Sequence, residues 1–150
     1  MKTIRDEKCR AGLLERLNNL TPDAKASWGR MNVEQMLSHL VQAGELPFAS
    51  DIPDRSTFVS RNFIKPMVLY ILPMPKEIKT SEDMDQQQKG RPPLGFEVDR
   101  AKVIDSVNRL GALPADHECF YHPFFGKMSA REWGLIAHKH MDHHLRQFGV

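Results

Sequence analysis

The sequence predicts an all-α protein, a bundle of four principal helices with two long connections that forms one domain over residues 1–150. Apolar residues recur at helical spacing in segments 4–20, 32–46 and 97–110, and again after Ser129. No segment alternates apolar and polar residues with the period of a strand, and no internal repeat is present. A chain of 150 residues is also long enough to bury a substantial core.

The first helix is expected over residues 4–20, where leucines form one stripe, and Thr21-Pro22 ends it. The second helix begins at Asn32, where Gln35 completes a capping box, and stops near Gly44–Leu46. On this helix, His39 lies roughly 130° from the centre of the main apolar stripe. A helix with two neighbours would bury His39, whereas a surface helix would expose it.

A third, partly helical stretch is expected over residues 56–72, with Pro66 kinking or splitting it. Its apolar residues are compatible with core packing and equally with a homodimer interface. Residues 73–95 are expected to be irregular, because prolines and glycines interrupt them repeatedly. A loop of this length in a small domain is functional or mobile, and it could fold over the mouth of a pocket.

The fourth helix is expected over residues 97–110, with Gly111 as its C-terminal stop. The last helix opens at Ser129 with a capping box that Glu132 completes. The connection between them, residues 112–128, contains an aromatic patch that we expect to pack over the end of the bundle: Phe120-Tyr121-His122-Pro123-Phe124-Phe125.

Four of the seven histidines lie within seven consecutive residues of the last helix. At about 100° per residue, His140 and His144 fall on its apolar face, while His138 and His143 point elsewhere. Asp142 is expected on the far, solvated face. Burying two imidazoles without partners costs on the order of 1–3 kcal/mol each. The inward pair therefore predicts a ligand or hydrogen bonds that compensate this cost.

A histidine pair at i and i+4 can grip one metal ion, as in HExxH metalloproteases, although Met141 stands here where those enzymes carry Glu. A catalytic metal site typically has three protein ligands and an open position for water or substrate. His39 is the one other histidine within a predicted long helix, which makes it the first candidate for the third ligand. His117 and His122 lie on a loop and rank behind it.

The residues around these histidines form motifs at both ends of the chain. An early helix carries Met36-Leu37-Ser38-His39-Leu40, and the last helix carries His140-Met141-Asp142-His143-His144 followed by Arg146-Gln147. This pattern resembles the DinB/YfiT-like metalloprotein superfamily. The segments 122–129, 132–133 and 143–149 resemble an uncharacterised branch of it. The likeness covers nearly the whole chain, although residues 47–98 match only in general character.

Members of that superfamily are four-helix bundles of up-down-down-up topology that bind a divalent metal. One ligand comes from the second helix, and an H-x-x-x-H pair comes from the last. The resemblance therefore implies that His39, His140 and His144 are metal ligands and that His143 does not ligate. Zinc, nickel and iron all suit imidazole, so the metal stays open. The superfamily includes transferases and isomerases that use low-molecular-weight thiols, alongside members labelled as hydrolases.

Two functions from different classes follow. The first is a metal-dependent enzyme, either a hydrolase or a thiol S-transferase, that acts on an unknown small molecule. A low-molecular-weight thiol is a possible cosubstrate. Its catalytic acid or base is unknown, and Glu45 and His122 are the nearest guesses. The alternative is a non-enzymatic binding protein with a structural or adventitious metal. A structural site would be closed by a fourth protein ligand, such as His117, His122 or a carboxylate.

Composition and charge limit the kinds of partner this chain can bind and the cellular compartment in which it is expected. The net charge is +2 and no run of five basic residues occurs, which argues against nucleic acid and against a membrane surface. Cys9 and Cys119 form no disulfide framework, as expected in a reducing cytoplasm. The charged N-terminus resembles no signal peptide, and the longest apolar run, residues 67–72, is too short to span a bilayer. We therefore expect a soluble cytoplasmic protein.

Overall fold

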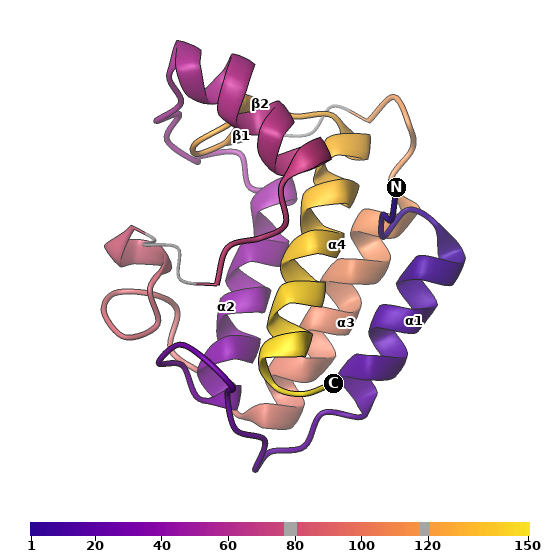
Figure 1. The fold of residues 1–150 in the computed structure, drawn as a ribbon, viewed down its shortest axis with the longest axis vertical. Helices are drawn as coiled ribbons and strands as arrows, with labels where there is room; N and C mark the ends of the chain where they lie inside the picture. The colour runs from indigo at the N-terminus through magenta and orange to yellow at the C-terminus, as the bar shows by residue number, and fades with distance from the viewer. Residues whose placement is uncertain (77–80, 118–120) are drawn as a thin grey trace.

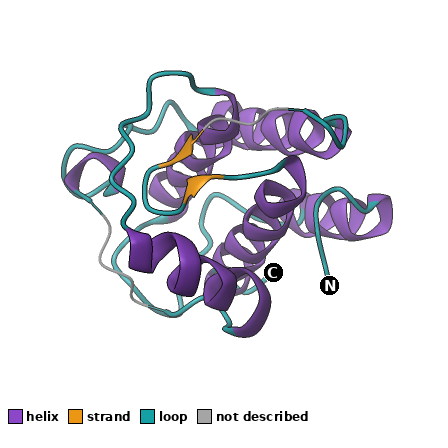
Figure 2. Cartoon of the chain, turned by 90° about the horizontal axis from the view of Figure 1, so that it is seen from above, coloured by secondary structure: helices purple, strands orange, loops and turns teal. Residues whose placement is uncertain are grey.

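The computed structural model describes residues 1–76, 81–117 and 121–150. These residues are mostly helical, with one short β hairpin, so the predicted all-α class is confirmed (Figure 2). The predictions for Cys119 and Phe120, and the part of the irregular stretch at 77–80, lie outside the described residues. None of the described helices combines the length and apolar composition that crossing a membrane requires.

Four α helices lie side by side (Figure 1): α1 (Glu7–Asn18), α2 (Val33–Glu45), α3 (Phe96–Ala112) and α4 (Ala130–Gln147). The helix α3 contacts each of the other three, and α4 contacts α1 and α2 as well. In Figure 1, α2 and α3 run in one direction, while α1 and α4 run in the opposite one. One apolar core lies between them, with all four helices contributing fully buried side chains such as Leu17, Leu37, Val103 and Leu145.

Capping decides where these helices begin. Both predicted capping boxes form, at Asn32 before α2 and at Ser129 before α4. The first helix is shorter than the predicted segment 4–20, because the Asp6 carboxylate accepts a hydrogen bond from the backbone N–H of Cys9 (2.8 Å) and caps it there. The apolar residues just outside α1 still reach the core, so its apolar pattern is longer than its helical backbone.

Gly111 does not end α3 as predicted, because the helix continues to Ala112. A Cβ atom on Gly111 would lie 2.6 Å from Nη1 of Arg10 and 3.0 Å from the carbonyl oxygen of Ile4. The glycine thus allows close packing of the N-terminal segment against α3. Its role is steric and does not depend on a helix-terminating conformation.

Residues 58–71 are helical throughout, with two π-helical segments, η2 (Ser60–Ile64) and η3 (Met67–Ile71), on either side of Lys65 and Pro66. Pro66 therefore does not split the stretch as one alternative of the prediction had it, because its backbone keeps helical dihedral angles. Leu69 is fully buried, whereas Phe58 and Ile71 are 72% and 73% exposed. Core packing therefore does not explain the apolar residues of this stretch.

Two short segments of the second connection form an antiparallel hairpin, β1 (Tyr121–His122) with β2 (Gly126–Lys127). Strands of two residues are too short to produce an alternating pattern, so periodicity did not predict them. Gly126 adopts φ +69°, a left-handed conformation that favours glycine, at the end of the turn. The hairpin contacts the short 3₁₀ helix η1 (Leu46–Phe48) that follows α2.

The first long connection, residues 73–95, is fastened to the helices through a buried ion pair. Asp99 of α3 is fully buried and accepts hydrogen bonds from Arg91 Nη2 (2.8 Å) and from the backbone N–H of Leu94 (2.9 Å). Arg91 also donates to Ser38 Oγ on α2 (2.9 Å). These contacts hold the end of the connection, and with it the 3₁₀ helix η4 (Glu82–Met84), beside α2.

Replacing Asp99 with Ala should lower the free energy of unfolding by about 3 kcal/mol, because Arg91 would keep a partly buried charge without its partner. Urea denaturation followed by circular dichroism measures the change. Glu97→Ala is the matched control, since Glu97 forms an exposed ion pair with Arg100 in the same helix. It should cost less than about 1 kcal/mol. Equal losses in the two variants would contradict the role given to Asp99.

Candidate metal centre

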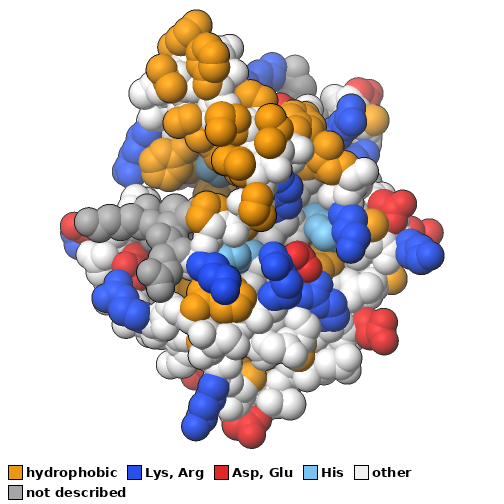
Figure 3. All heavy atoms as spheres, in the orientation of Figure 1, with side chains coloured by type: hydrophobic (Ala, Val, Ile, Leu, Met, Phe, Trp, Pro, Cys, Tyr) orange, Lys and Arg blue, Asp and Glu red, His pale blue; other side chains and the backbone are white. Residues whose placement is uncertain are grey.

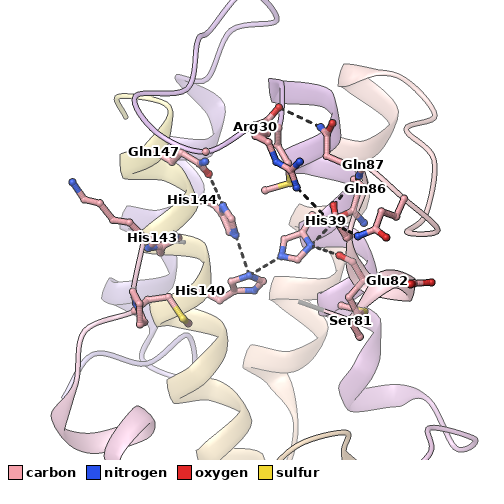
Figure 4. Close-up of a pocket in the computed structure, with 18 of the residues that line it drawn as sticks. Arg30, His39, Ser81, Glu82, Gln86, Gln87, His140, His143, His144 and Gln147 are labelled. Carbon is pink, nitrogen blue, oxygen red and sulfur yellow. Dashed lines mark hydrogen bonds and ion pairs between the residues drawn. The ribbon is translucent and has the colours of Figure 1, made fainter. Parts of the chain in front are cut away.

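Three histidines from two helices, α2 and α4, point toward one another between those helices (Figure 4). His39 Nε2 lies 2.9 Å from His140 Nε2, and His144 Nε2 lies 3.1 Å from the same atom. The structure therefore brings together the three residues predicted as metal ligands. Their ligand atoms lie within 4.8 Å of one another. Two nitrogens that each lie about 2.0 Å from a tetrahedral zinc ion are about 3.3 Å apart, which is close to both distances.

Hydrogen bonds determine which nitrogen of His39 carries the proton. Its Nδ1 lies 3.0 Å from Gln86 Oε1 and 3.3 Å from the carbonyl oxygen of Met84. The Gln86 amide is oriented by Gln42, because Gln86 Nε2 donates to Gln42 Oε1 (2.8 Å) and Gln42 Nε2 donates to the carbonyl oxygen of Asp83 (2.7 Å). Both neighbours of His39 Nδ1 are thus acceptors. Nδ1 must be the donor, and Nε2 of neutral His39 has a lone pair.

The same reasoning applies to His144. Gln147 Nε2 donates to the carbonyl oxygen of Trp28 (2.6 Å), which turns Gln147 Oε1 toward His144 Nδ1 at 2.8 Å. His144 therefore donates from Nδ1, and its Nε2 also has a lone pair. Imidazoles that bind metals usually donate their other N–H to an oxygen in this way.

Two lone pairs, from His39 and His144, thus point at Nε2 of His140. This nitrogen can carry at most one proton, so it can satisfy at most one of them. In either tautomer of His140, at least one pair of nitrogens faces lone pair to lone pair at hydrogen-bonding distance. A cation shared by the three nitrogens removes this conflict. The donor set therefore fits a metal ion better than it fits a closed hydrogen-bond network.

Burial lowers the pKa of all three imidazoles, because a charged ring would lose its hydration. The pKa of His144 falls to about 3, and that of His140 lies well below its usual range, with His144 and His39 adding to the effect of burial. Burial also lowers the pKa of His39, although its hydrogen bonds to Gln86 and Met84 oppose this. All three are neutral at pH 7, the form in which imidazole binds a metal.

A cavity of about 1090 Å³ adjoins the three histidines. Histidines of α4 line one side, and Ser81, Glu82, Gln86 and Gln87 of the first long connection lie on the side of His39, next to Arg30 (Figure 4). The connection contributes Met74, Pro75, Lys76, Ser81, Glu82 and Met84 to Gln88. The described residues of this loop therefore line a pocket, in agreement with the expectation that the loop could fold over the mouth of one.

A family model described as "Protein of unknown function (DUF1569)" matches residues 8–149. The chain belongs to the DUF1569 family. No curated protein and no solved structure matches it. The matched region contains all three histidines and both glutamines that orient them, so the centre described above lies entirely within the family domain.

In this DUF1569 chain neither of the two loop histidines belongs to the three-histidine group, although His122 lies close enough for its charge to lower the pKa of His140. His122 Nδ1 accepts hydrogen bonds from the backbone N–H groups of Phe124 (3.1 Å) and Phe125 (3.3 Å), and its ring stacks on Phe125 at 4.4 Å. The prediction of a packed loop holds for His122 and Phe125, whereas Tyr121 and Phe124 are 45% and 44% exposed. His117 is exposed on the loop after α3. Neither residue lines the cavity.

The remaining side chains of α4 correct three predictions. His138 and His143, expected to point away from the core, are 7% and 6% exposed. His143 packs edge-on against Trp28 and lines the cavity. Asp142, expected in solvent, is half-buried and bonded to Arg16 of α1 at 2.6 Å. Other parts of the chain cover α4 on most sides, so its apolar stripe marks only part of its buried surface.

The glutamines that orient His39 and His144 were not predicted from the sequence. Gln147 lies three residues after His144 on the same helix face, a spacing that could have identified it. Gln86 lies in an irregular segment far along the chain from His39, and nothing in the sequence connects the two. Glu45, a guessed acid or base, instead pairs with Arg109 (3.1 Å) and does not line the cavity.

The buried ring of His122 should make the protein acid-sensitive. Burial lowers its pKa to about 4 in the folded state, whereas an unfolded imidazole has a pKa of about 6.5. The unfolded chain therefore binds the proton first as the pH falls. The stabilisation is complete above about pH 6.5 and is lost as the pH falls toward about 4.

We expect His122→Asn to reduce this loss. The Asn oxygen can replace Nδ1 as acceptor for the two backbone N–H groups, but it does not titrate. Between about pH 6 and about 4.5, the free energy of unfolding should fall more steeply with pH in the wild type than in the variant. The difference in slope should reach up to about 1.4 kcal/mol per pH unit. Urea denaturation across this range measures it. Parallel pH profiles for the two proteins would contradict the assignment.

Proposed function

We propose that this DUF1569 protein is a metal-dependent enzyme whose divalent cation is held by His39, His140 and His144. The observation that carries the proposal is the convergence of three imidazole nitrogens beside a cavity, two of them with lone pairs set by glutamine side chains. Zn²⁺, Ni²⁺ and Fe²⁺ are all compatible with three neutral imidazoles.

The ligand set favours a catalytic site over a structural one. A structural zinc site is usually closed by a fourth protein ligand. Among the described residues, the group of possible ligands at this point consists of the three histidines alone. The cavity borders these histidines. A small molecule in the cavity could therefore reach the coordination position of the cation that no protein residue fills. The alternative, a binding protein with a structural or adventitious metal, lacks this support.

We also propose that the chain is a distant member of the DinB/YfiT-like superfamily with its up-down-down-up four-helix bundle. The helix directions in Figure 1 support this, since α2 and α3 run together and α1 and α4 run the other way. One histidine on α2 and two on α4, four residues apart, agree with the ligand pattern that the resemblance implies.

Thiol transfer is the reaction that the cavity supports best. A divalent cation supplies positive charge that lowers the pKa of a thiol or a water and polarises an electrophile. A water needs a nearby base to take its proton, while a thiol with a pKa of about 8.5 needs little help. The described acids of the cavity are engaged elsewhere: Glu82 pairs with Lys89 (2.6 Å), and Asp85 accepts from Gln88 (2.9 Å).

Hydrolysis is the second candidate, and His143 is the observation that favours it. This residue lines the cavity, and its ring lies 5.0 Å from that of His144. Burial lowers the pKa of His143, with Arg146 adding to the effect, so the ring is neutral at pH 7. A neutral imidazole at that place could accept the proton of a water.

His140→Ala should abolish tight zinc binding, because it removes the nitrogen toward which the other two point. Gln147→Leu should weaken binding by about 10–100-fold, since it removes the acceptor that orients His144. His138→Ala is the control, because His138 lies on the same helix outside the three-histidine group. Isothermal titration calorimetry of metal-free protein measures the affinities. Wild-type affinity in His140→Ala would place the metal elsewhere.

Metal-loaded protein should consume an electrophile, such as an epoxide or an aryl halide, only in the presence of a low-molecular-weight thiol. The rate should fall at least about 100-fold in His140→Ala, as expected when the nucleophile loses its activation. Turnover of an ester or amide without thiol would contradict transfer and favour hydrolysis, and such turnover should then depend on His143. Collapse of the fold on chelation would instead favour the structural alternative.

A further inference from the structure

The helical segment 58–72 presents an apolar surface that the rest of the chain leaves uncovered. It lies across one end of the α helices in Figure 1, and Figure 3 shows the hydrophobic side chains gathered there. Eight large apolar residues of this segment are 41–73% exposed: Phe58, Val59, Phe63, Ile64, Met67, Tyr70, Ile71 and Leu72. We call these eight residues the 58–72 surface.

The segment is held firmly in place on its inner side. Leu69 is fully buried, and Lys139 of α4 donates from Nζ to the carbonyl oxygens of Val68 (2.6 Å) and Leu72 (2.8 Å). Lys65 forms an ion pair with Glu132 at the start of α4 (3.0 Å). The 58–72 surface is therefore a fixed feature of the fold and does not need to order itself when it binds a partner.

The π-helical turns help to gather aromatic side chains on the outer side. Phe58, Phe63, Met67 and Ile71 follow one another at spacings of five, four and four residues. A π turn contains more residues than an α turn, so such spacings stay nearer to one face. Phe58 and Phe63 are in edge-to-face contact, with ring centroids 6.4 Å apart. Rigid aromatic groups of this kind are typical anchors of protein interfaces.

The area of the 58–72 surface matches that of a stable dimer. Taking about 200 Å² for a fully exposed large apolar side chain, the eight residues expose roughly 850 Å². A standard protein interface buries about 800 Å² on each partner. Monomeric proteins rarely expose a continuous apolar patch of this size without a binding role.

The charges around the 58–72 surface favour a protein partner over a lipid bilayer. Binding to an anionic membrane draws on free lysines and arginines beside the apolar residues. Here Lys65 pairs with Glu132, and the ammonium group of Lys139 is used by two backbone carbonyls. Arg61 lies close enough to Asp54 to interact with its charge. These three cations therefore offer little free positive charge to phosphate groups.

We propose that the 58–72 surface binds the same surface of a second copy of this chain, which forms a twofold symmetric dimer. A symmetric contact places one patch against its own copy, so an apolar patch with aromatic anchors is complementary to itself. The two helical segments then cover one another, and each chain keeps its own three-histidine centre. This inference does not depend on the proposed metal or reaction.

Sedimentation equilibrium of the full chain at micromolar concentration tests the proposal. The wild type should be a dimer, and Phe63→Glu should weaken dimerisation by at least about 30-fold. Leu94→Glu is the matched control, because Leu94 is 56% exposed, close to the 58% of Phe63, but lies outside the 58–72 surface. It should remain a dimer. Far-ultraviolet circular dichroism of each variant checks that the fold is kept.

A wild type that is monomeric at about 100 μM, well above the Kd of an ordinary stable interface, would overturn the proposal whatever the variants do. A dimer that survives both Phe63→Glu and Ile71→Glu would also overturn it, since the contact would then lie elsewhere. Sedimentation with vesicles of phosphatidylglycerol and phosphatidylcholine tests whether the 58–72 surface binds a lipid bilayer instead. Monomeric protein that binds these vesicles through Phe63 would assign the surface to a membrane instead.

Discussion

The meeting of three imidazole nitrogens between α2 and α4 is the constraint on which the surrounding structure depends. Two of the rings are fixed through their Nδ1 atoms, His39 by Gln86 and His144 by Gln147. Each glutamine is in turn oriented by another part of the chain, through Gln42 in one case and the Trp28 carbonyl in the other. Segments far apart in sequence are thereby tied to one point.

Burying several imidazoles is unfavourable, and the fold compensates this cost locally. Hydrogen bonds to oxygen satisfy one nitrogen of His39 and one of His144, which keeps both rings neutral and correctly turned. The nitrogens facing His140 remain without a full set of proton donors. The proposed shared cation would satisfy them, and metal binding would then stabilise this region.

The two proposals concern different parts of one rigid scaffold. The metal centre lies between α2 and α4 and opens on a cavity walled by the first long connection, which the buried Arg91–Asp99 pair fastens to α3. The 58–72 surface lies across one end of the helices and is anchored to α4 through Lys139. Helix α4 therefore supports both, with His140 beside the cavity and its neighbour Lys139 directed toward the exposed segment.

The sequence by itself determined the helical class, both capping boxes and the inward pair His140 and His144, because these depend on spacing within one helix. The burial of His39, the positions of Gln86 and Gln147 and the covering of His138 and His143 were decided only by tertiary structure. Helical projection describes one helix at a time, and it does not say how many neighbours surround it. The exposure of the 58–72 surface could not be predicted for the same reason. An apolar pattern identifies the residues that avoid water, but it does not show which part of the chain covers them.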